Sequence, residues 1–176
     1  MYDTEIGEWR GADPAELDGL AEVLHAAVHA GASVSFILPF SKDDARAFWA
    51  DKILPDVRRR KRRVLIARGS GILAGTVQLN LDVPPNQAHR AEVIKLLVHP
   101  AARRRGIARA LMTAIEEIAR AEGRTLLTLD TRTGDAAEPL YLSLGYVLAG
   151  VIPRYARHPA ESRLEGTSIL YKELTA

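Results

Sequence analysis

The chain has 176 residues, of which 47% are hydrophobic and 26% are charged, and its formal net charge is +2. This length and composition predict one folded domain over residues 1–176 with a hydrophobic core, and they argue against disorder and against a dedicated polyanion-binding protein. No apolar run approaches the ~18 residues of a membrane span and residues 1–10 lack a signal-peptide core, so we expect a soluble cytoplasmic protein.

The N-terminal segment is predicted to form an edge strand over residues 2–9 and then a helix over residues 14–30. Asp13 is typical of a helix N-cap, and Glu16 is expected to complete a capping box. The apolar residues that follow recur at helical spacing until Gly31 ends the pattern.

A second helix is predicted to begin at Ser41, with Pro55 kinking or restarting it. The basic run from Arg58 to Arg63 follows at the helix end. Six consecutive cations could contact nucleic acid, but the run lacks interleaved aromatic residues and a nucleic-acid-binding motif. Because cations are favoured at a helix C-terminus, we interpret the run as a solvated helix end and expect no nucleic-acid partner.

Strands dominate the middle of the chain. Residues 64–68 and 72–81, joined by a glycine-serine-glycine turn at 69–71, are predicted to form a hairpin. The Pro84-Pro85-Asn86 segment interrupts the pattern before a further strand at 91–98.

The C-terminal half is predicted to alternate helices and strands. An amphipathic helix over 105–122 stops at Gly123. The remaining elements are a strand at 126–129 that ends at Asp130, a short helix at 136–144, and strands at 146–152 and 166–173 separated by a loop at 154–165.

The segment from Ala91 to Met112 is predicted to form a strand, a tight basic turn and an amphipathic helix. Unpaired N–H groups and the helix dipole make the start of a helix favourable for an anion. Gly106 allows the backbone to approach a ligand closely, and the neighbouring arginines add positive charge. The segment therefore predicts a pyrophosphate cradle, with a solvated arginine cluster as the alternative.

The order Arg103-x-x-Gly106-x-Ala108 resembles the Arg/Gln-x-x-Gly-x-Gly/Ala signature of the GNAT acetyltransferase superfamily. A second segment, residues 135–146, resembles that superfamily's Ala-x-x-Leu/Phe-Tyr-x-x-x-Gly-Tyr/Phe helix. The resemblance implies an α+β GNAT fold, in which about four helices flank a mixed, mostly antiparallel sheet. That sheet has six or seven strands and is splayed between the fourth and fifth.

The resemblance also implies acetyl-CoA as co-substrate, with its pantetheine arm between the strands at 91–98 and 124–130. Backbone groups of Leu96, Leu97 and Val98 would bind the arm and place an N–H near the thioester oxygen. The implied pyrophosphate-binding residues are Arg103, Arg104, Arg105, Gly106, Ile107, Ala108 and Arg109.

Three residues are candidates for acid–base catalysis. At pH 7 only about one part in 10³ of an alkyl amine is neutral, so an amine acetyltransferase benefits from a base. Glu92 occupies the position of the general base in histone-type members of the superfamily, and Asp130 lies on the neighbouring strand. The alternative for each is a plain ion pair, of Glu92 with Arg90 or another nearby cation and of Asp130 with Lys95.

Tyr141 matches the superfamily tyrosine that hydrogen-bonds the sulfur of coenzyme A and protonates the leaving thiolate, with a core tyrosine as the alternative. The chain has no cysteine, which excludes disulfides, thiolate metal sites and a cysteinyl acyl-enzyme. Acyl transfer must then use another nucleophile or go directly to the acceptor, and with the base, oxyanion donor and acid that the resemblance implies we expect direct transfer to the amine through a ternary complex.

Two positions depart from the superfamily pattern. Gly134 stands where many relatives have an asparagine, so the pantetheine contact of that asparagine side chain is not carried over to this chain. Lys95 interrupts an otherwise apolar strand and has no cofactor role. We expect it to form a buried pair with Glu92 or Asp130.

A metal site is not expected. Glu22, His25 and His29 share a helix flank with histidines at i and i+4, but the HExxH order and a third ligand are missing.

More narrowly, the chain resembles tabtoxin-resistance acetyltransferases. The shared residues are 29–34, Pro85-Asn86, 90–93, Lys95-Leu96 and 129–131 with Gly134. That family acetylates an amino group of a small β-lactam toxin, which implies a toxin- or antibiotic-resistance function and a small amino-acid-like amine as acceptor. The alternatives are a non-catalytic acyl-CoA sensor, a protein-amine acetyltransferase and a nucleic-acid-binding module. A monomer or homodimer is expected.

Overall fold

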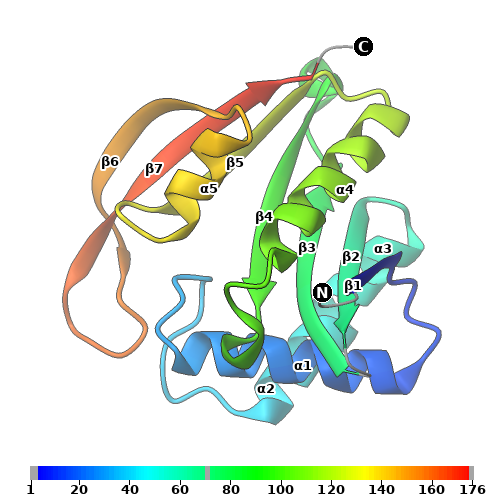
Figure 1. Ribbon diagram of the computed structural model, residues 1–176, viewed down its shortest axis with the longest axis vertical. Coiled ribbons are helices and arrows are strands. Elements are labelled where there is room, and N and C mark those ends of the chain that lie inside the picture. The colour runs from blue at the N-terminus through cyan, green and yellow to red at the C-terminus, as the bar shows by residue number, and fades with distance from the viewer. Residues whose placement is uncertain (1–3, 70–71, 175–176) are drawn as a thin grey trace.

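The computed structural model describes residues 4–69 and 72–174, and its strands form one seven-stranded sheet with the order β1-β2-β3-β4-β5-β7-β6 (Figure 1). The strands are β1 (Thr4–Glu8), β2 (Arg62–Gly69), β3 (Ile72–Asn80), β4 (Arg90–Val98), β5 (Leu126–Arg132), β6 (Val147–Arg157) and β7 (Leu164–Glu173). The helices are α1 (Pro14–His29), α2 (Lys42–Ala47), α3 (Leu54–Arg58), α4 (Ile107–Ala121) and α5 (Ala137–Ser143). A π-helical turn at Phe48–Ile53 joins α2 to α3 into one irregular helix. The predicted fold class, with four helical units, is therefore confirmed.

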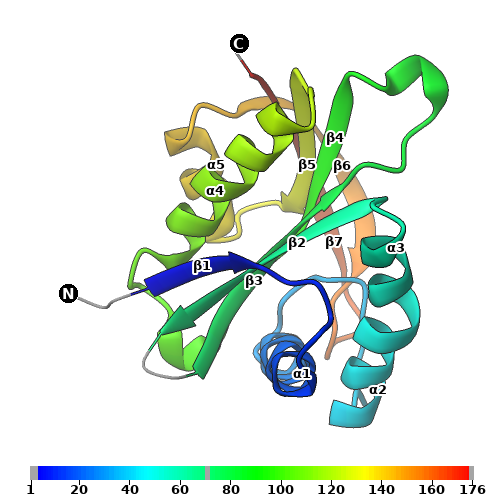
Figure 2. The same cartoon turned by 90° about the vertical axis from the view of Figure 1, so that its right-hand side faces the viewer.

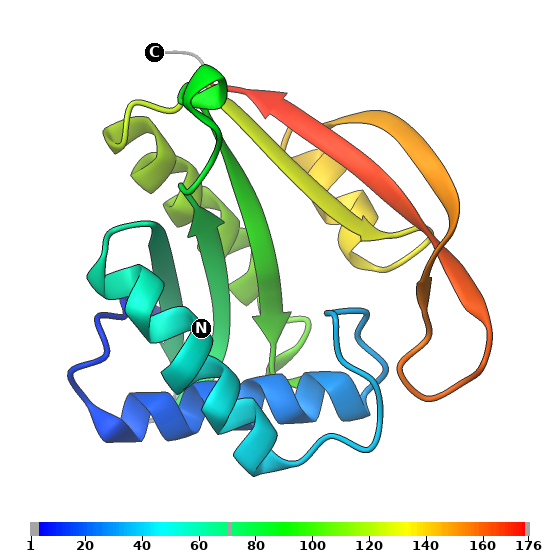
Figure 3. The ribbon, with the colours of Figure 1, turned by 180° about the vertical axis from the view of Figure 1, so that it is seen from behind.

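Strands β4 and β5 are the only parallel neighbours in the described sheet, and they pair only along Arg90–Glu92 and Leu126–Thr128. Beyond Glu92 the two strands diverge, and Figure 3 shows the resulting V-shaped opening, with the loop after α1 lying at its wide end. Parted strands leave backbone N–H and C=O groups without sheet partners. The predicted splay is therefore present, and it exposes hydrogen-bonding edges inside the molecule.

The sheet separates two hydrophobic cores. Figure 2 shows α4 and α5 on one side of it and α1, α2 and α3 on the other. Fully buried side chains of α4, such as Leu111 and Ile115, pack with Leu127 on the first side. Trp9 and Trp49 meet edge to face at 5.8 Å on the second side, where α1 also packs. Burial of these apolar faces fixes the sheet between its helices.

The start of α1 differs in detail from its prediction. Asp13 caps the helix by accepting a hydrogen bond from the Ala15 N–H at 2.8 Å, as expected. The predicted capping box does not form, because the Glu16 carboxylate pairs instead with Arg68 of β2. A long-range ion pair has therefore replaced the local bond.

The second helix begins after its predicted cap, Ser41, and is interrupted near Pro55. Ser41 and Asp44 form a reciprocal capping box, with Asp44 N–H donating to Ser41 Oγ at 3.0 Å. Pro55 lacks an N–H group and so cannot continue a regular helix. The π-helical turn immediately before it absorbs the interruption, and α3 restarts around Pro55.

The basic run 58–63 is only partly the solvated helix end that the sequence predicted. Arg62 and Arg63 lie in β2, and their side chains are only 16% and 17% exposed. Arg63 bonds Glu8 at 2.8 Å and, through Nε, Glu122 at 2.9 Å. It therefore ties β1 to the end of α4, a contact between distant segments that local charge patterning could not indicate.

The C-terminal hairpin is longer than predicted. Residues 154–157 and 164–165, expected in a loop, extend β6 and β7 through the pairs Ala156–Glu165 and Arg157–Leu164. A register shift between Ile152 and Ala156 interrupts the apolar alternation that would have revealed the strand. The middle of the predicted turn at 69–71 lies outside the described residues.

Candidate active site

A cavity of about 720 Å³ occupies the opening between β4 and β5. It is lined by β4, by β5, by the loop after α1, and by the starts of α4 and α5. On β4 and β5, Val93 and Leu129 face the α4 side, and Glu92 and Asp130 alternate with them on the opposite face. Because α4 residues and both carboxylates line the same cavity, the cavity passes through the sheet from one face to the other.

A β-bulge in β4 shapes this cavity. Thr76 pairs with Leu97 but Gln78 pairs with Ile94, so Lys95 and Leu96 together oppose one residue of β3. As a result Val93 packs in the α4-side core, whereas Leu97, four positions later, packs in the α1-side core. The bulge therefore turns Lys95 toward the face that carries Glu92.

The basic turn before α4 has the geometry of an anion cradle. Gly106 precedes the helix with a φ of +80°, which side-chain-bearing residues rarely adopt, and no side chain caps the helix. The first N–H groups of α4 therefore have no side-chain cap and lie at the cavity wall. The predicted coenzyme residues on this wall are Leu96, Leu97, Val98, Arg103, Arg104, Gly106, Ile107, Ala108 and Arg109. Arg105 is predicted but is not among the lining residues, and Arg109 donates a 2.7 Å hydrogen bond to Ser143 of α5.

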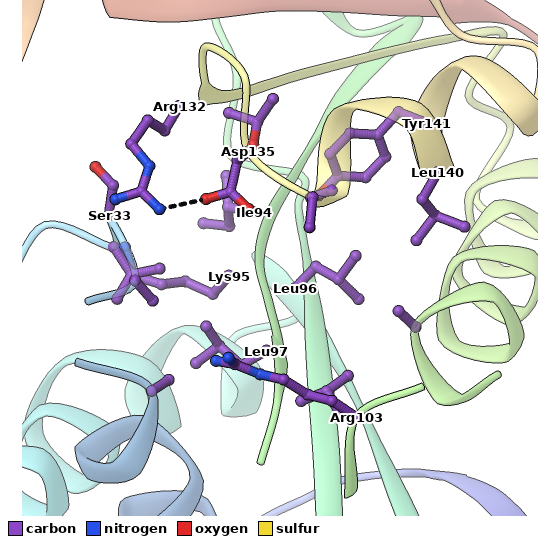
Figure 4. Close-up of a pocket in the computed structure, with 18 of the residues that line it drawn as sticks. Ser33, Ile94, Lys95, Leu96, Leu97, Arg103, Arg132, Asp135, Leu140 and Tyr141 are labelled. Atoms are coloured by element: carbon purple, nitrogen blue, oxygen red, sulfur yellow. Dashed lines mark hydrogen bonds and ion pairs between the residues drawn. The ribbon is translucent and has the colours of Figure 1, made fainter. Parts of the chain in front are cut away.

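Tyr141 of α5 lines the cavity from the α4 side (Figure 4). Its side chain is 6% exposed and contacts the Tyr146 ring edge to face, with ring centroids 5.9 Å apart. Its hydroxyl has no hydrogen-bond partner among residues 4–69 and 72–174. Burial raises the pKa of Tyr141 well above its usual range, and the charges of Asp135 and Asp130 act in the same direction. The phenol is therefore protonated and available to a ligand.

Glu92 and Asp130 both line the cavity, and neither forms the ion pair that the alternative interpretation required. Arg90 donates instead to Gln87 at 2.7 Å and to Thr128 at 3.2 Å. Asp130 lies inside β5 rather than at its end, is exposed, and accepts a 3.2 Å hydrogen bond from Thr167. Glu92 is partly buried and forms no hydrogen bond or ion pair with any residue that the structure describes.

The predicted pairing of Lys95 with Glu92 or Asp130 is wrong. The Lys95 ammonium donates a 3.0 Å hydrogen bond to Ser35 Oγ and lies 5.8 Å from the centre of the Phe36 ring. The bulge brings Lys95 onto the face that carries Glu92, but on that face the ammonium group contacts the loop after α1 instead of a carboxylate.

Sequence reasoning missed Arg132 and its contact with the loop at 30–35. Arg132 donates to the Gly31 carbonyl at 3.0 Å, to Asp135 at 2.9 Å and to Glu165 at 3.3 Å. Figure 4 shows Arg132 and Asp135 with Ser33 and Lys95 at one end of the pocket, away from Tyr141 and Leu140. No motif indicates a contact between residues 101 positions apart. Only the resemblance over 29–34 singled out this loop.

Neither a metal site nor a membrane segment is found in the described part of the chain. No group of three or more histidine, aspartate and glutamate side chains there is placed to hold a metal ion. Glu22 instead pairs with Lys42 at 2.5 Å, and the His25 and His29 rings pack 4.1 Å apart. Within residues 4–69 and 72–174, no helix combines the length and apolar character needed to cross a bilayer.

Comparisons with known proteins agree with this geometry. The sequence profile of the acetyltransferase (GNAT) family matches residues 25–146. A curated relative, an uncharacterized N-acetyltransferase from the hisH-hisA intergenic region of Azospirillum brasilense, is 32% identical over 126 residues, which are 70% of this chain and 73% of the relative.

Solved structures of similar fold cover nearly the whole chain. The yncA protein of Salmonella typhimurium, solved with its cofactor acetyl-CoA, has a TM-score of 0.78 at 20% identity and covers 98% of this chain and 94% of its own. An N-acetyltransferase from Staphylococcus aureus has a TM-score of 0.81 at 17% identity, with 98% and 99% covered. At these identities the likeness shows the fold.

Proposed function

Because the chain belongs to the acetyltransferase (GNAT) family and is an N-acetyltransferase, we propose that it transfers acetyl from acetyl-CoA directly to an amine of a small molecule, through a ternary complex. The observation that carries the proposal is the cavity through the sheet, which brings an anion cradle, a protonated phenol and two carboxylates to one space. Acetyl-CoA would supply the activated acyl group as a thioester, and the acceptor would enter from the opposite face.

On the α4 side, the cradle and the free edge of β4 fit the two parts of the coenzyme. The uncapped start of α4 with Arg103 and Arg104 would bind the pyrophosphate, and Leu96 to Val98 would pair with the pantetheine arm. A β4 N–H near the thioester oxygen would stabilise the negative charge that develops there, an effect worth roughly 3 kcal/mol.

On the acceptor side, we assign the base role to Glu92. Its carboxylate has no hydrogen bond among the described residues, whereas Asp130 already accepts one from Thr167. Glu92 would take the proton that the amine loses, directly or through a water molecule. Asp130 would attract the acceptor's ammonium group, and Tyr141 would donate a hydrogen bond to the leaving sulfur.

A small acceptor is favoured by the loop after α1, which is bonded to β5 at the far end of the cavity. Arg132 holds the Gly31 carbonyl and thereby draws the loop after α1 against β5. A protein substrate needs an open groove at this end. A β-lactam toxin or amino-acid-like amine, which the resemblance suggests as the acceptor of a resistance enzyme, is therefore the first acceptor class to test.

Thiol release from acetyl-CoA, measured against a panel of small amines, tests the proposed function. We expect saturable acetylation of at least one amine and saturable heat on titration with coenzyme A alone. Coenzyme binding without turnover of any amine would support a sensor instead, whereas acetylation of lysine peptides but not small amines would support a protein-amine acetyltransferase.

The pH dependence of kcat at saturating acceptor tests the base assignment. The Glu92→Gln variant is expected to lose the acidic limb of the profile and to lower kcat by about 10²- to 10³-fold, because an amide cannot accept the proton. The matched Asp130→Asn variant should retain that limb. The opposite pattern would move the base to Asp130, and an unchanged limb in both variants would remove both residues from the role.

A further inference from the structure

Lys95 is a charged residue of the cavity that the proposed reaction does not use. It comes from β4, lines the cavity, and reaches toward the loop after α1, where Ser35 accepts its hydrogen bond at 3.0 Å (Figure 4). An ammonium group has three donors, and within the described residues only this one has a partner. Two donors are therefore left for a ligand.

The backbone is distorted on both sides of this contact. Lys95 has a φ of +54° at the bulge in β4, and Ser35 has a φ of +75°. Positive φ at a residue with a side chain is costly and is concentrated at functional sites. Two such residues that contact each other indicate that this position of the ammonium group is maintained by the fold.

Charged side chains of both signs act on Lys95, but none of them is its ion-pair partner. The carboxylates of Glu92 and Asp130 exert the attractive influences, but neither forms an ion pair with Lys95. Arg62, on β2, adds further positive charge nearby. Burial disfavours the charged form of Lys95 and lowers the pKa of its ammonium group. A negative group that arrives with a ligand would stabilise the charged form. The two carboxylates attract a cation, while the remaining N–H donors of Lys95 can bind an anion in the same cavity.

We propose that Lys95 binds a carboxylate of the acceptor, so that the enzyme acetylates a zwitterionic, α-amino-acid-like molecule whose ammonium group faces Glu92 and Asp130. This inference rests on the proposed function, because it names the substrate class of the same site. Ser35 accepts one hydrogen bond of the ammonium group from the loop side, and the carboxylate of the acceptor would take the remaining donors. A simple amine without an anionic group leaves Lys95 unpaired and is the poorer substrate.

The test compares L-amino acids with their primary amides as acceptors, using thiol release from acetyl-CoA by the intact chain. For the wild type, kcat/KM is expected to favour the acid by about 10- to 100-fold over its amide. The Lys95→Met variant should lose that preference mainly through a higher KM for the acid, with kcat/KM for the amide changed by less than about threefold. The ratio of acid to amide is compared between the two proteins, so that the different amine pKa values of acid and amide cancel.

Two further variants separate recognition from structure. Lys95→Arg keeps the positive charge and should retain most of the preference for the acid. Ser35→Ala removes the loop contact but keeps the cation, so it should also retain most of the preference. If Lys95 only held the loop, Ser35→Ala would match Lys95→Met, and both would reduce acid and amide equally.

The outcomes distinguish a failure of the Lys95 assignment from a failure of the proposed acetyltransferase function. Turnover of amines without any preference for a carboxylate, or a preference that survives Lys95→Met, overturns the assignment of Lys95 and leaves the acetyltransferase function intact. Binding of coenzyme A with no turnover of any amine overturns both.

Discussion

Replacing Tyr141 with phenylalanine is expected to lower kcat by about 10²- to 10³-fold while leaving the Kd for coenzyme A within about twofold. The substitution removes one hydroxyl, which has no protein partner in the described structure and lines the cavity. The ring remains, so its edge-to-face contact with Tyr146 is preserved. Steady-state thiol release measures the first quantity, and calorimetric titration with coenzyme A measures the second.

The high pKa of Tyr141 sharpens this prediction. Because burial raises that pKa, the phenol stays protonated through the alkaline range of the assay, and its ionisation should not limit the rate there. Tyr155, 56% exposed on β6, provides a control, and Tyr155→Phe should leave both quantities unchanged. A Tyr141→Phe enzyme with wild-type kcat would show that the tyrosine serves packing alone.

Replacing Gly75 with valine is expected to destabilise the fold by about 3 kcal/mol, lowering Tm by roughly 6–12 °C. Gly75 pairs with Val98 at the end of β4, next to the start of α4. A Cβ atom there would lie 2.8 Å from the Leu97 carbonyl oxygen and 3.2 Å from side-chain carbons of Ile107 and Leu111. Thermal unfolding followed by circular dichroism measures the loss.

The same substitution should damage function as well as stability. The groups that a valine would displace are the β4 edge and the first turn of α4, which are the two proposed coenzyme-binding elements. A misplacement of this kind is expected to reduce kcat/KM by about 10²-fold. Gly150→Val is the matched control, because a Cβ at that position of β6 meets nothing within 4 Å. Equal effects of the two valines would contradict the close-approach explanation.

Much of the fold could be predicted because its signals are local. The patterns that predict α4 and the hairpin of β2 and β3 each span about twenty residues or fewer, and the structure confirms both elements. The splay between β4 and β5 came from the resemblance, since no residue pattern states where two strands part. The ends of β6 and β7 were misjudged because irregular pairing hides their alternation.

The parts of the candidate site that come from neighbouring residues in the sequence were predicted better than the parts that depend on contacts between remote segments. The cradle from Arg103 to Ala108 follows one strand, and all of these residues except Arg105 line the cavity. The placement of Lys95 could not be predicted, because the bulge that turns it depends on the register of β3 against β4. Arg132 was missed because its partner at Gly31 is remote in the sequence.

The bond between Arg132 and the Gly31 carbonyl has a kinetic consequence. It closes a chain loop of 101 residues, whereas the cradle assembles from neighbours along the chain. Because the entropy of closing a long loop must be overcome before such a contact can form, we expect this contact to form later in folding than the cradle. The coenzyme half of the site is therefore expected to assemble first, and the acceptor end to be completed only once the loop after α1 and β5 have met.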